Sequence, residues 1–328
     1  MPKMMSTLLP EDLEPTHDGV LEGHSETTLA YLRWEHPSPK GRVVIAHGYG
    51  EHAGRYRHTA KWLHDLGWSV SAMDHRGFGR SGGIRGDADS IHAFVEDLAL
   101  FLRHERHHDA ERRKAPPRIV DGVPMPPLPV CPQVLMGHSF GGLVGLLVLL
   151  WHADTMDGLV LSSPAVTLRR MGPILNCLQN LMLWLAPHRS LKLPNDKDAV
   201  CSDPIMVQRY WGDPLCHRYV SAAFAQALRQ GREEILPLGH ELDRPILLLD
   251  AENDVVVDPD GSEALWTAVR PQFLERYRLE GFKHEILHDR LRLEAQALIE
   301  TWLGNLWVQW PRNPQAASVM TLLGTVRE

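Results

Sequence analysis

The sequence predicts an α/β domain in which a mostly parallel sheet is covered by helices on both faces. Short, continuous apolar segments recur along the chain, as expected for strands buried on both faces: residues 43–46, 68–74, 133–138, 158–164 and 245–250. Helical patterns separate the first of these strands, which favours right-handed crossovers and a parallel sheet. The alternation stops over residues 165–236, which we expect to form a helical cap (lid) inserted after the sixth strand.

The remaining elements complete this plan in chain order. Residues 19–35 alternate as a hairpin at a sheet edge would, and helices are expected at 56–66 and 90–104. Residues 109–132 are rich in proline and lose periodicity, which indicates a surface loop or short excursion. A last strand at 276–279 precedes an amphipathic helix at 290–307.

The domain boundaries follow from this order. Residues 1–164 and 237–310 are expected to form the core, 165–236 the cap, and 311–328 a mobile tail. Within the cap, residues 171–186 are almost wholly apolar, so a helix there must bury more than one face or line an apolar pocket.

Composition excludes several classes of protein. The 328 residues include 34 Lys and Arg against 41 Asp and Glu, and the net charge of −7 argues against a nucleic-acid partner. Four scattered cysteines without a C-x-x-C pattern indicate reduced thiols and suggest neither a zinc site nor a disulfide framework. No cofactor is expected. The N-terminus has no secretory signal pattern, and no apolar run reaches the roughly 18 residues that span a bilayer. We expect a cytoplasmic protein, and its apolar cap leaves transient, peripheral contact with a membrane or micelle open.

The chemistry centres on Gly137-His138-Ser139-Phe140-Gly141, between a short apolar strand and an apolar helix. This is the context of a nucleophile elbow, the sharp turn that exposes the serine of an α/β-hydrolase. Side chains at the two flanking positions would collide with the backbone, so glycine is required there. Because the elbow residue is serine, the epoxide hydrolases and dehalogenases of this fold, which use aspartate, are excluded.

A serine hydroxyl needs a base, and the base needs a carboxylate to orient it. In this fold they follow the serine in the order acid, then histidine, in loops after later strands. Asp254 is the predicted acid, with Glu252 and Asp258 as alternatives in the same loop. His284 is the predicted base, and His288 is its competitor four residues on.

The tetrahedral intermediate of acyl transfer needs two N–H donors aimed at its oxyanion. The backbone N–H of Phe140 is one natural donor, and we expect Tyr49, after the first buried strand, to supply the other.

These segments resemble the monoacylglycerol lipase and lysophospholipase branch of the α/β-hydrolases. The resemblance covers about residues 25–305 and rests on co-linear motifs in the oxyanion loop, the loop after the second buried strand, the elbow and the cap: residues 47–56, 74–81, 137–142, 202–204 and 210–215. Two features depart from the family, namely Ala251 in place of a common glycine and the long proline-rich segment.

The resemblance implies that Glu51, Arg55, His138 and Tyr210 lie near the alcohol end of the substrate. For Glu51 and Arg55, a structural ion pair that holds the oxyanion loop is an equal alternative. The motif residues Asp74, Arg76 and Ser81 are expected to support loops.

The predicted function is a serine ester hydrolase that cleaves small acyl esters, such as monoacylglycerols or lysophospholipids, through an acyl-enzyme. A peptidase or a perhydrolase with the same triad stays open, as does a non-catalytic lipid-binding protein. The acyl chain length, the head group and the oligomeric state are open as well.

Overall fold

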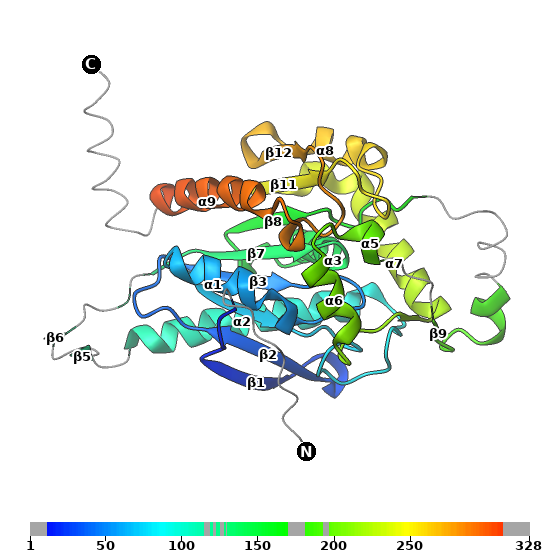
Figure 1. Cartoon of the computed structure of the whole chain (residues 1–328), viewed down its shortest axis with the longest axis horizontal. Helices are drawn as coiled ribbons and strands as arrows, with labels where there is room; N and C mark the ends of the chain where they lie inside the picture. The colour runs from blue at the N-terminus through cyan, green and yellow to red at the C-terminus, as the bar shows by residue number, and fades with distance from the viewer. Residues whose placement is uncertain are drawn as a thin grey trace.

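An eight-stranded sheet forms the centre of the molecule in a computed structural model that describes residues 12–114, 119–120, 123–124, 128, 130–169, 181–192 and 197–310. The strand order is β1-β2-β4-β3-β7-β8-β11-β12, which runs from the bottom to the top of Figure 1. Strand β2 is antiparallel to β1 and β4, whereas all other neighbours are parallel. The predicted α/β class and the edge hairpin are confirmed.

The strands of this sheet have the following bounds: β1 His17–Glu22, β2 Thr28–Trp34, β3 Arg42–Ala46, β4 Ser69–Met73, β7 Gln133–His138, β8 Gly158–Ser162, β11 Ile246–Ala251 and β12 Leu274–Leu279. Two short antiparallel pairs lie outside it: β5 Ile119–Val120 with β6 Val123–Pro124, and β9 Leu191–Lys192 with β10 Tyr219–Val220.

Helices connect the strands, and their bounds are α1 Arg57–Asp65, α2 Ile91–Lys114, α3 Phe140–Trp151, α5 Lys197–Val200, α6 Pro204–Gly212, α7 Ala222–Ile235, α8 Glu263–Ala268 and α9 Arg292–Gln309. Short 3-10 turns are η1 His24–Glu26, η2 Ala53–Tyr56, η3 Ala153–Thr155, η4 Leu236–Glu241, η5 Asp260–Ser262, η6 Pro271–Phe273 and η7 Ile286–His288. None of the helices in these described ranges is long and apolar enough to cross a membrane.

Each face of the sheet packs against its own set of helices, because successive residues of a strand point to opposite faces. Val44 belongs to an apolar cluster with residues of α2, α3 and α7, whereas its neighbours Val43 and Ile45 belong to a second cluster with α1 and α9. The strands are therefore covered on both sides, which explains why they are continuously apolar in the sequence.

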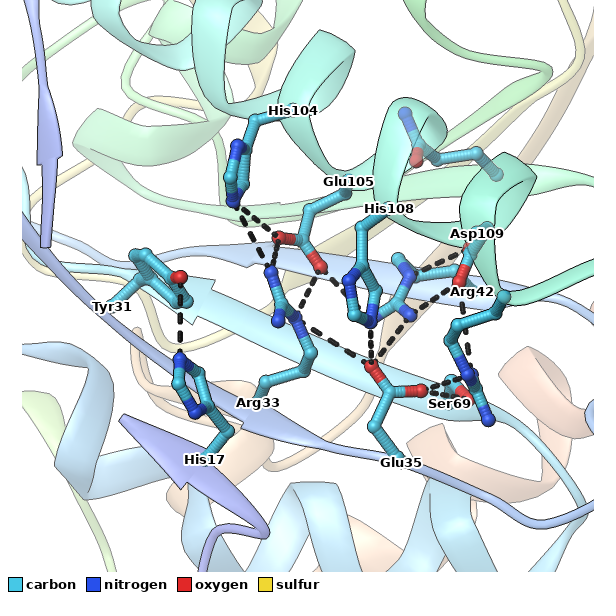
Figure 2. A network of polar contacts seen from close by, with 12 residues as sticks. His17, Tyr31, Arg33, Glu35, Arg42, Ser69, His104, Glu105, His108 and Asp109 are labelled. Carbon is cyan, nitrogen blue, oxygen red and sulfur yellow. Dashed lines mark hydrogen bonds and ion pairs between the residues drawn. The ribbon is translucent and has the colours of Figure 1, made fainter. Parts of the chain in front are cut away.

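Helix α2 runs through Lys114, so the loop expected to begin at Asp109 is wrong over its first six residues. An ionic network explains the difference (Figure 2). Asp109 pairs with Arg42 of β3, and Arg112 pairs with Glu35. This end of the helix packs through charged side chains, so it lacks the apolar pattern by which a helix is recognised. The rest of the proline-rich segment lies mostly outside the described residues.

The network continues along α2 to Glu105, whose side chain is fully buried. Glu105 accepts from Arg33 at 2.6 Å, and its other oxygen lies 2.9 Å from Nη1 of Arg42 (Figure 2). Arg42 is the first residue of β3, whereas the elbow lies after the last residue of β7, which is parallel to β3. The network and the elbow are thus at opposite ends of the sheet.

Between β8 and β11 the chain leaves the sheet and forms α5, α6 and α7. Helix α7 packs against α2 and α3. The apolar helix expected at 171–186 lies mostly outside the described residues. The part of it that the structure describes is helical over residues 181–185. The cap boundaries at 165 and 236 stay predictions, and so does the mobile tail, which falls outside the described residues.

Candidate active site

Ser139 lies in a strained turn between β7 and α3. Its φ of 50° and ψ of −113° fall in a region that residues with side chains rarely adopt. The close approach of other backbone explains the glycines: a Cβ on Gly137 would lie 2.7 Å from the oxygen of Gly141, and one on Gly141 would lie 2.2 Å from the oxygen of Ala46. The turn therefore presents the Ser139 hydroxyl at the carboxyl edge of the sheet.

His284 lies between Ser139 and Asp254. Its Nε2 is 2.9 Å from Oγ of Ser139, and its Nδ1 is 2.7 Å from Oδ2 of Asp254. Ser139 follows β7, Asp254 follows β11 and His284 follows β12, so the carboxyl ends of parallel strands in one part of the sheet bring together residues that are distant in sequence. All three side chains are buried.

Asp254 is held in its ionised form. Burial raises the pKa of its carboxyl group, but hydrogen bonds from His284 and from the backbone N–H groups of Val256 and Val257 outweigh burial and lower it below the usual value. Both backbone N–H groups donate to Oδ1 at 2.8 Å, which leaves Oδ2 directed at the imidazole. Such an anion fixes the tautomer of the histidine and stabilises its protonated form.

The alternative acids and base lie in other surroundings. Glu252 is exposed and accepts from the backbone N–H of Gly281. The backbone N–H of Asp258 donates to the oxygen of Thr167 at 2.9 Å, outside the Ser139 site. His288 is buried against the rings of Tyr56 and His58. Of these candidates, only Asp254 and His284 belong to the chain of hydrogen bonds that the described residues form to Ser139.

The loop after β3 passes beside Ser139. A Cβ placed on Gly48 would lie 3.4 Å from Cβ of Ser139 and 2.9 Å from Cδ2 of His138. Tyr49, the next residue, is the predicted oxyanion donor, and its hydroxyl donates to the oxygen of Tyr219 at 2.6 Å. Phe140 is the first residue of α3, so its N–H lies at the helix N-terminus, where backbone donors favour an anion.

The carboxylate of Glu51 is occupied by groups of the protein. Its Oε1 accepts from the backbone N–H of Gly48 at 2.6 Å and from the hydroxyl of Tyr56 at 2.8 Å, and its Oε2 pairs with Nη1 of Arg55. Burial raises its pKa, but the nearby Arg55 guanidinium reverses that effect and lowers the pKa well below the usual range. Nη2 of Arg55 reaches Glu285 at 3.0 Å. Of the two readings for Glu51 and Arg55, these contacts favour a structural ion pair that holds the oxyanion loop.

The other two predicted substrate residues, Tyr210 and His138, contact Arg55 and the base, respectively. The guanidinium carbon of Arg55 lies 5.2 Å from the ring centroid of Tyr210 in α6. The Tyr210 hydroxyl donates to the oxygen of His217 at 3.3 Å. His138 lies beside the base, with its ring centroid 5.0 Å from that of His284. Burial lowers the pKa of His138 to about 4, so this ring is neutral at physiological pH.

The three motif residues expected to support loops make such contacts. Asp74 accepts from the backbone N–H groups of Ala53 and Arg80, both at 2.7 Å, and Ser81 donates to the oxygen of Asp74. Arg76 pairs with Asp97 of α2, at 2.6 Å.

Within the described ranges, two groups of side chains have distances compatible with a metal ion: His52, Asp213 and Cys216, and Glu35, His108 and Asp109. In the first, His52 and Asp213 already share a hydrogen bond of 2.8 Å. In the second, both carboxylates are paired with arginines.

Sequence reasoning missed Glu285 and Arg169. Glu285 follows the base and pairs with Arg55, whereas Nε of Arg169 donates to the backbone oxygen of Asp254 at 2.8 Å. A charged residue next to the predicted base was a usable signal for Glu285. Nothing in the sequence around Arg169 indicates its contact.

Residues 37–291 match the family described as Serine aminopeptidase, S33. The chain belongs to this family. It is 32% identical over 254 residues to Monoacylglycerol lipase of Mycolicibacterium smegmatis, covering 76% of this chain and 83% of the relative. It is 29% identical over 274 residues to human Monoglyceride lipase, covering 83% of each chain.

A solved structure supports the same assignment. The crystal structure of Paleococcus ferrophilus monoacylglycerol lipase matches with a TM-score of 0.69 and 26% identity, covering 85% of this chain and 99% of that one. The resemblance read from the sequence is therefore confirmed, and this member of the Serine aminopeptidase, S33 family is a serine hydrolase with the α/β-hydrolase fold.

Proposed function

We propose that the protein hydrolyses monoacylglycerols, with Ser139 as nucleophile, His284 as base and Asp254 as the orienting acid. The observation that carries the proposal is the position of His284, which lies 2.9 Å from the hydroxyl of Ser139 and 2.7 Å from the carboxylate of Asp254. Both distances are within hydrogen-bond reach, as a base and its orienting acid require. The names of the relatives supply the substrate class.

The reaction begins when Nε2 of His284 takes the proton of Ser139 as Oγ bonds to the ester carbonyl carbon. The carbonyl oxygen becomes an oxyanion, which accepts from the backbone N–H groups of Tyr49 and Phe140. The intermediate then breaks the bond to the alcohol oxygen, and imidazolium returns its proton to that oxygen. Glycerol leaves, and the fatty acyl group stays bonded to Oγ.

The second half of the reaction repeats these steps with water. His284 takes a proton from water while the water oxygen bonds to the acyl carbon. The new intermediate expels Oγ of Ser139, which regains the proton from His284. The fatty acid is released and the free enzyme is restored. Asp254 stays ionised throughout and stabilises the imidazolium formed in each half.

The polar alcohol end of the substrate is proposed to lie near Arg55, His138 and Tyr210. A neutral His138 can donate to or accept from a glycerol hydroxyl, which suits an uncharged alcohol. Glu51 is proposed to act on the substrate indirectly, because its two oxygens hold Gly48, Tyr56 and Arg55.

The family description also names an aminopeptidase, which would need a carboxylate for the free α-ammonium group of its substrate. Glu51 and Glu285 are buried in this site, and both are paired with Arg55. This pairing favours an uncharged substrate over a peptide.

We also propose that the protein makes transient contact with a membrane or micelle surface while it collects substrate. Large apolar side chains are exposed on residues 181–191, with Trp184 81% and Leu185 60% exposed. A Trp184→Ser variant should sediment less with lipid vesicles and turn over emulsified monoacylglycerol more slowly. Its rate on a soluble short ester should be unchanged, and an unchanged rate on both substrates would contradict the proposal.

The central experiment compares wild type with Ser139→Ala. Wild type should release fatty acid from monoacylglycerol faster than from lysophosphatidylcholine and should react with a fluorophosphonate probe. The variant should lose on the order of 10⁶-fold in kcat, and one that kept more than about a hundredth would contradict the mechanism. A folded wild type that binds lipid but does not react with the probe would indicate a binding protein instead. Release of amine from an aminoacyl anilide, at a higher rate than fatty acid from an ester, would indicate a peptidase.

A further inference from the structure

Glu285 follows the base directly and is held on two sides. It is 4% exposed. Its backbone N–H donates to the oxygen of Val200 in α5 at 2.9 Å, and its Oε2 accepts from Nη2 of Arg55 at 3.0 Å. The segment that carries His284 is therefore fixed both to the chain between β8 and β11 and to the segment that follows the oxyanion loop.

Arg55 extends this contact to the oxyanion loop. Its second guanidinium nitrogen pairs with Glu51, whose other oxygen accepts the N–H of Gly48 at 2.6 Å. Gly48 directly precedes Tyr49, the proposed oxyanion donor. A continuous row of buried contacts thus joins the residue after the base to the residue before the oxyanion donor, and Glu285 and Glu51 share one guanidinium at its centre.

The separation between these two loops matters for the chemistry. The base must stay within hydrogen-bond reach of Ser139 while the N–H donors stay about 3 Å from the oxyanion. A misplacement of about 1 Å in such an arrangement can cost about 10²-fold in rate. A rigid, buried connection between the two loops preserves both distances at once.

We propose that Glu285 is a positioning residue for the hydrolysis proposed above, which acts through Arg55 to fix the base loop relative to the oxyanion loop. This inference rests on the proposed function. Because Glu285 acts through Arg55 and through the backbone of the base loop, its effect should appear in the rate of the chemical steps rather than in substrate affinity.

The test compares Glu285→Ala and Glu285→Gln with wild type on p-nitrophenyl butyrate. Rates are expressed per active site, counted by complete reaction with a fluorophosphonate probe, and the rate of the probe reaction is measured as well. Glu285→Ala should lower kcat and the probe rate by roughly 10- to 100-fold, while KM stays within about threefold. Glu285→Gln, which keeps an acceptor for Arg55, should lie between Glu285→Ala and wild type.

Glu105→Ala is the matched control. Like Glu285→Ala, this variant removes a buried carboxylate that pairs with buried arginine. Glu105 pairs with Arg33 and Arg42, at the opposite end of the sheet from the elbow (Figure 2). Glu105→Ala should lower the melting temperature and leave kcat and the probe rate within about twofold when all proteins are assayed well below their melting temperatures. An equal loss of kcat in Glu105→Ala would overturn the inference, because the effect of Glu285 would then be general destabilisation.

A second comparison tests whether Glu285 acts through Arg55. If it does, Arg55→Ala with Glu285→Ala should be no more than about threefold slower than Arg55→Ala alone, because residues that act as one unit are not additive. Multiplicative losses would overturn the role of Arg55 as the connection. A kcat of Glu285→Ala within threefold of wild type, or a loss confined to KM, would overturn the inference as a whole.

The outcomes also separate this inference from the proposed function. An active wild type with an equally active Glu285→Ala overturns only the positioning role. A wild type that neither hydrolyses esters nor reacts with the probe overturns both.

Discussion

The backbone N–H of Gly48 donates to Oε1 of Glu51 at 2.6 Å, which fixes the loop before the proposed oxyanion donor Tyr49. We predict that Glu51→Gln lowers kcat on p-nitrophenyl butyrate by roughly 10-fold or more while KM stays within about threefold. The amide NH₂ would face the Arg55 guanidinium, two donors would oppose each other, and the loop would shift. A lost oxyanion donor costs roughly 3 kcal/mol, which sets the upper end of the effect.

The same variant decides between the two readings of Glu51 when KM for monoacylglycerol is measured as well. If Glu51 contacted the substrate directly, Glu51→Gln would raise KM for monoacylglycerol and leave kcat on the short ester nearly unchanged. Glu14→Gln is a suitable control, because Glu14 pairs with Arg57 at a position where its side chain is 61% exposed. That variant should match wild type in both parameters.

The sequence predicted the sheet and the order of the site residues because both depend on local patterns. Strands β3, β7 and β11 are continuously apolar, and glycines mark the elbow around Ser139. Once the strands are placed, the parallel arrangement brings their carboxyl ends to one edge, which explains why residues as distant as Ser139 and His284 could be paired from sequence.

What the sequence did not predict depends on contacts between charged residues. The end of α2 is stabilised by Arg42, and charged side chains there look like those of a solvated loop. The pairing of Glu285 with Arg55 likewise requires the loops after β3 and β12 to meet near α5. The hydrophobic periodicity of the sequence does not indicate which loops come into contact. Ion pairs between distant segments are therefore the part of this fold that sequence patterns leave out.

Asp254 gives a prediction about the orienting acid. Asp254→Asn should lower kcat by roughly 10⁴-fold, because the amide cannot hold the imidazole of His284 in the tautomer that accepts the proton of Ser139. KM should change little. Steady-state rates on p-nitrophenyl butyrate measure both.

Glu252→Gln supplies the comparison for this variant. Glu252 lies in the same loop, is exposed and accepts from Gly281. The kcat of Glu252→Gln should stay within about threefold of the wild-type value. A larger loss in Glu252→Gln than in Asp254→Asn would reverse the assignment of the acid.

The ionic network at the opposite end of the sheet gives a prediction about stability. Glu105→Ala removes one buried carboxylate that Arg33 and Arg42 share (Figure 2). Breaking a buried pair costs about 3–5 kcal/mol, which is the upper end of the expected loss because Glu35 and Asp109 still pair with Arg42. Urea unfolding followed by fluorescence should report this loss. Glu111→Ala, which removes an exposed pair with Lys114 on the same helix, should change the unfolding free energy by less than about 1 kcal/mol.

Buried histidines make a prediction about acid stability. His75 packs against the rings of Phe94 and Phe140, and its two ring nitrogens have no hydrogen-bond partner in the part of the chain that the structure describes. Burial, reinforced by the neighbouring His47, lowers the pKa of His75 well below 6.5. Since the unfolded chain then binds a proton that the folded chain does not, the free energy of unfolding must fall as pH drops below about 6.5.

His75→Phe removes this titration and keeps an aromatic ring among Phe94 and Phe140. Its free energy of unfolding should therefore fall less steeply than that of wild type, by up to about 1.4 kcal/mol for each pH unit below about 6.5. Urea titrations at pH 7.5, 6.5 and 5.5 measure both slopes, and His240→Gln, at an exposed side chain, should keep the wild-type slope. Equal slopes for wild type and His75→Phe would mean that the folded protein protonates His75 as readily as the unfolded chain does, which its apolar surroundings argue against.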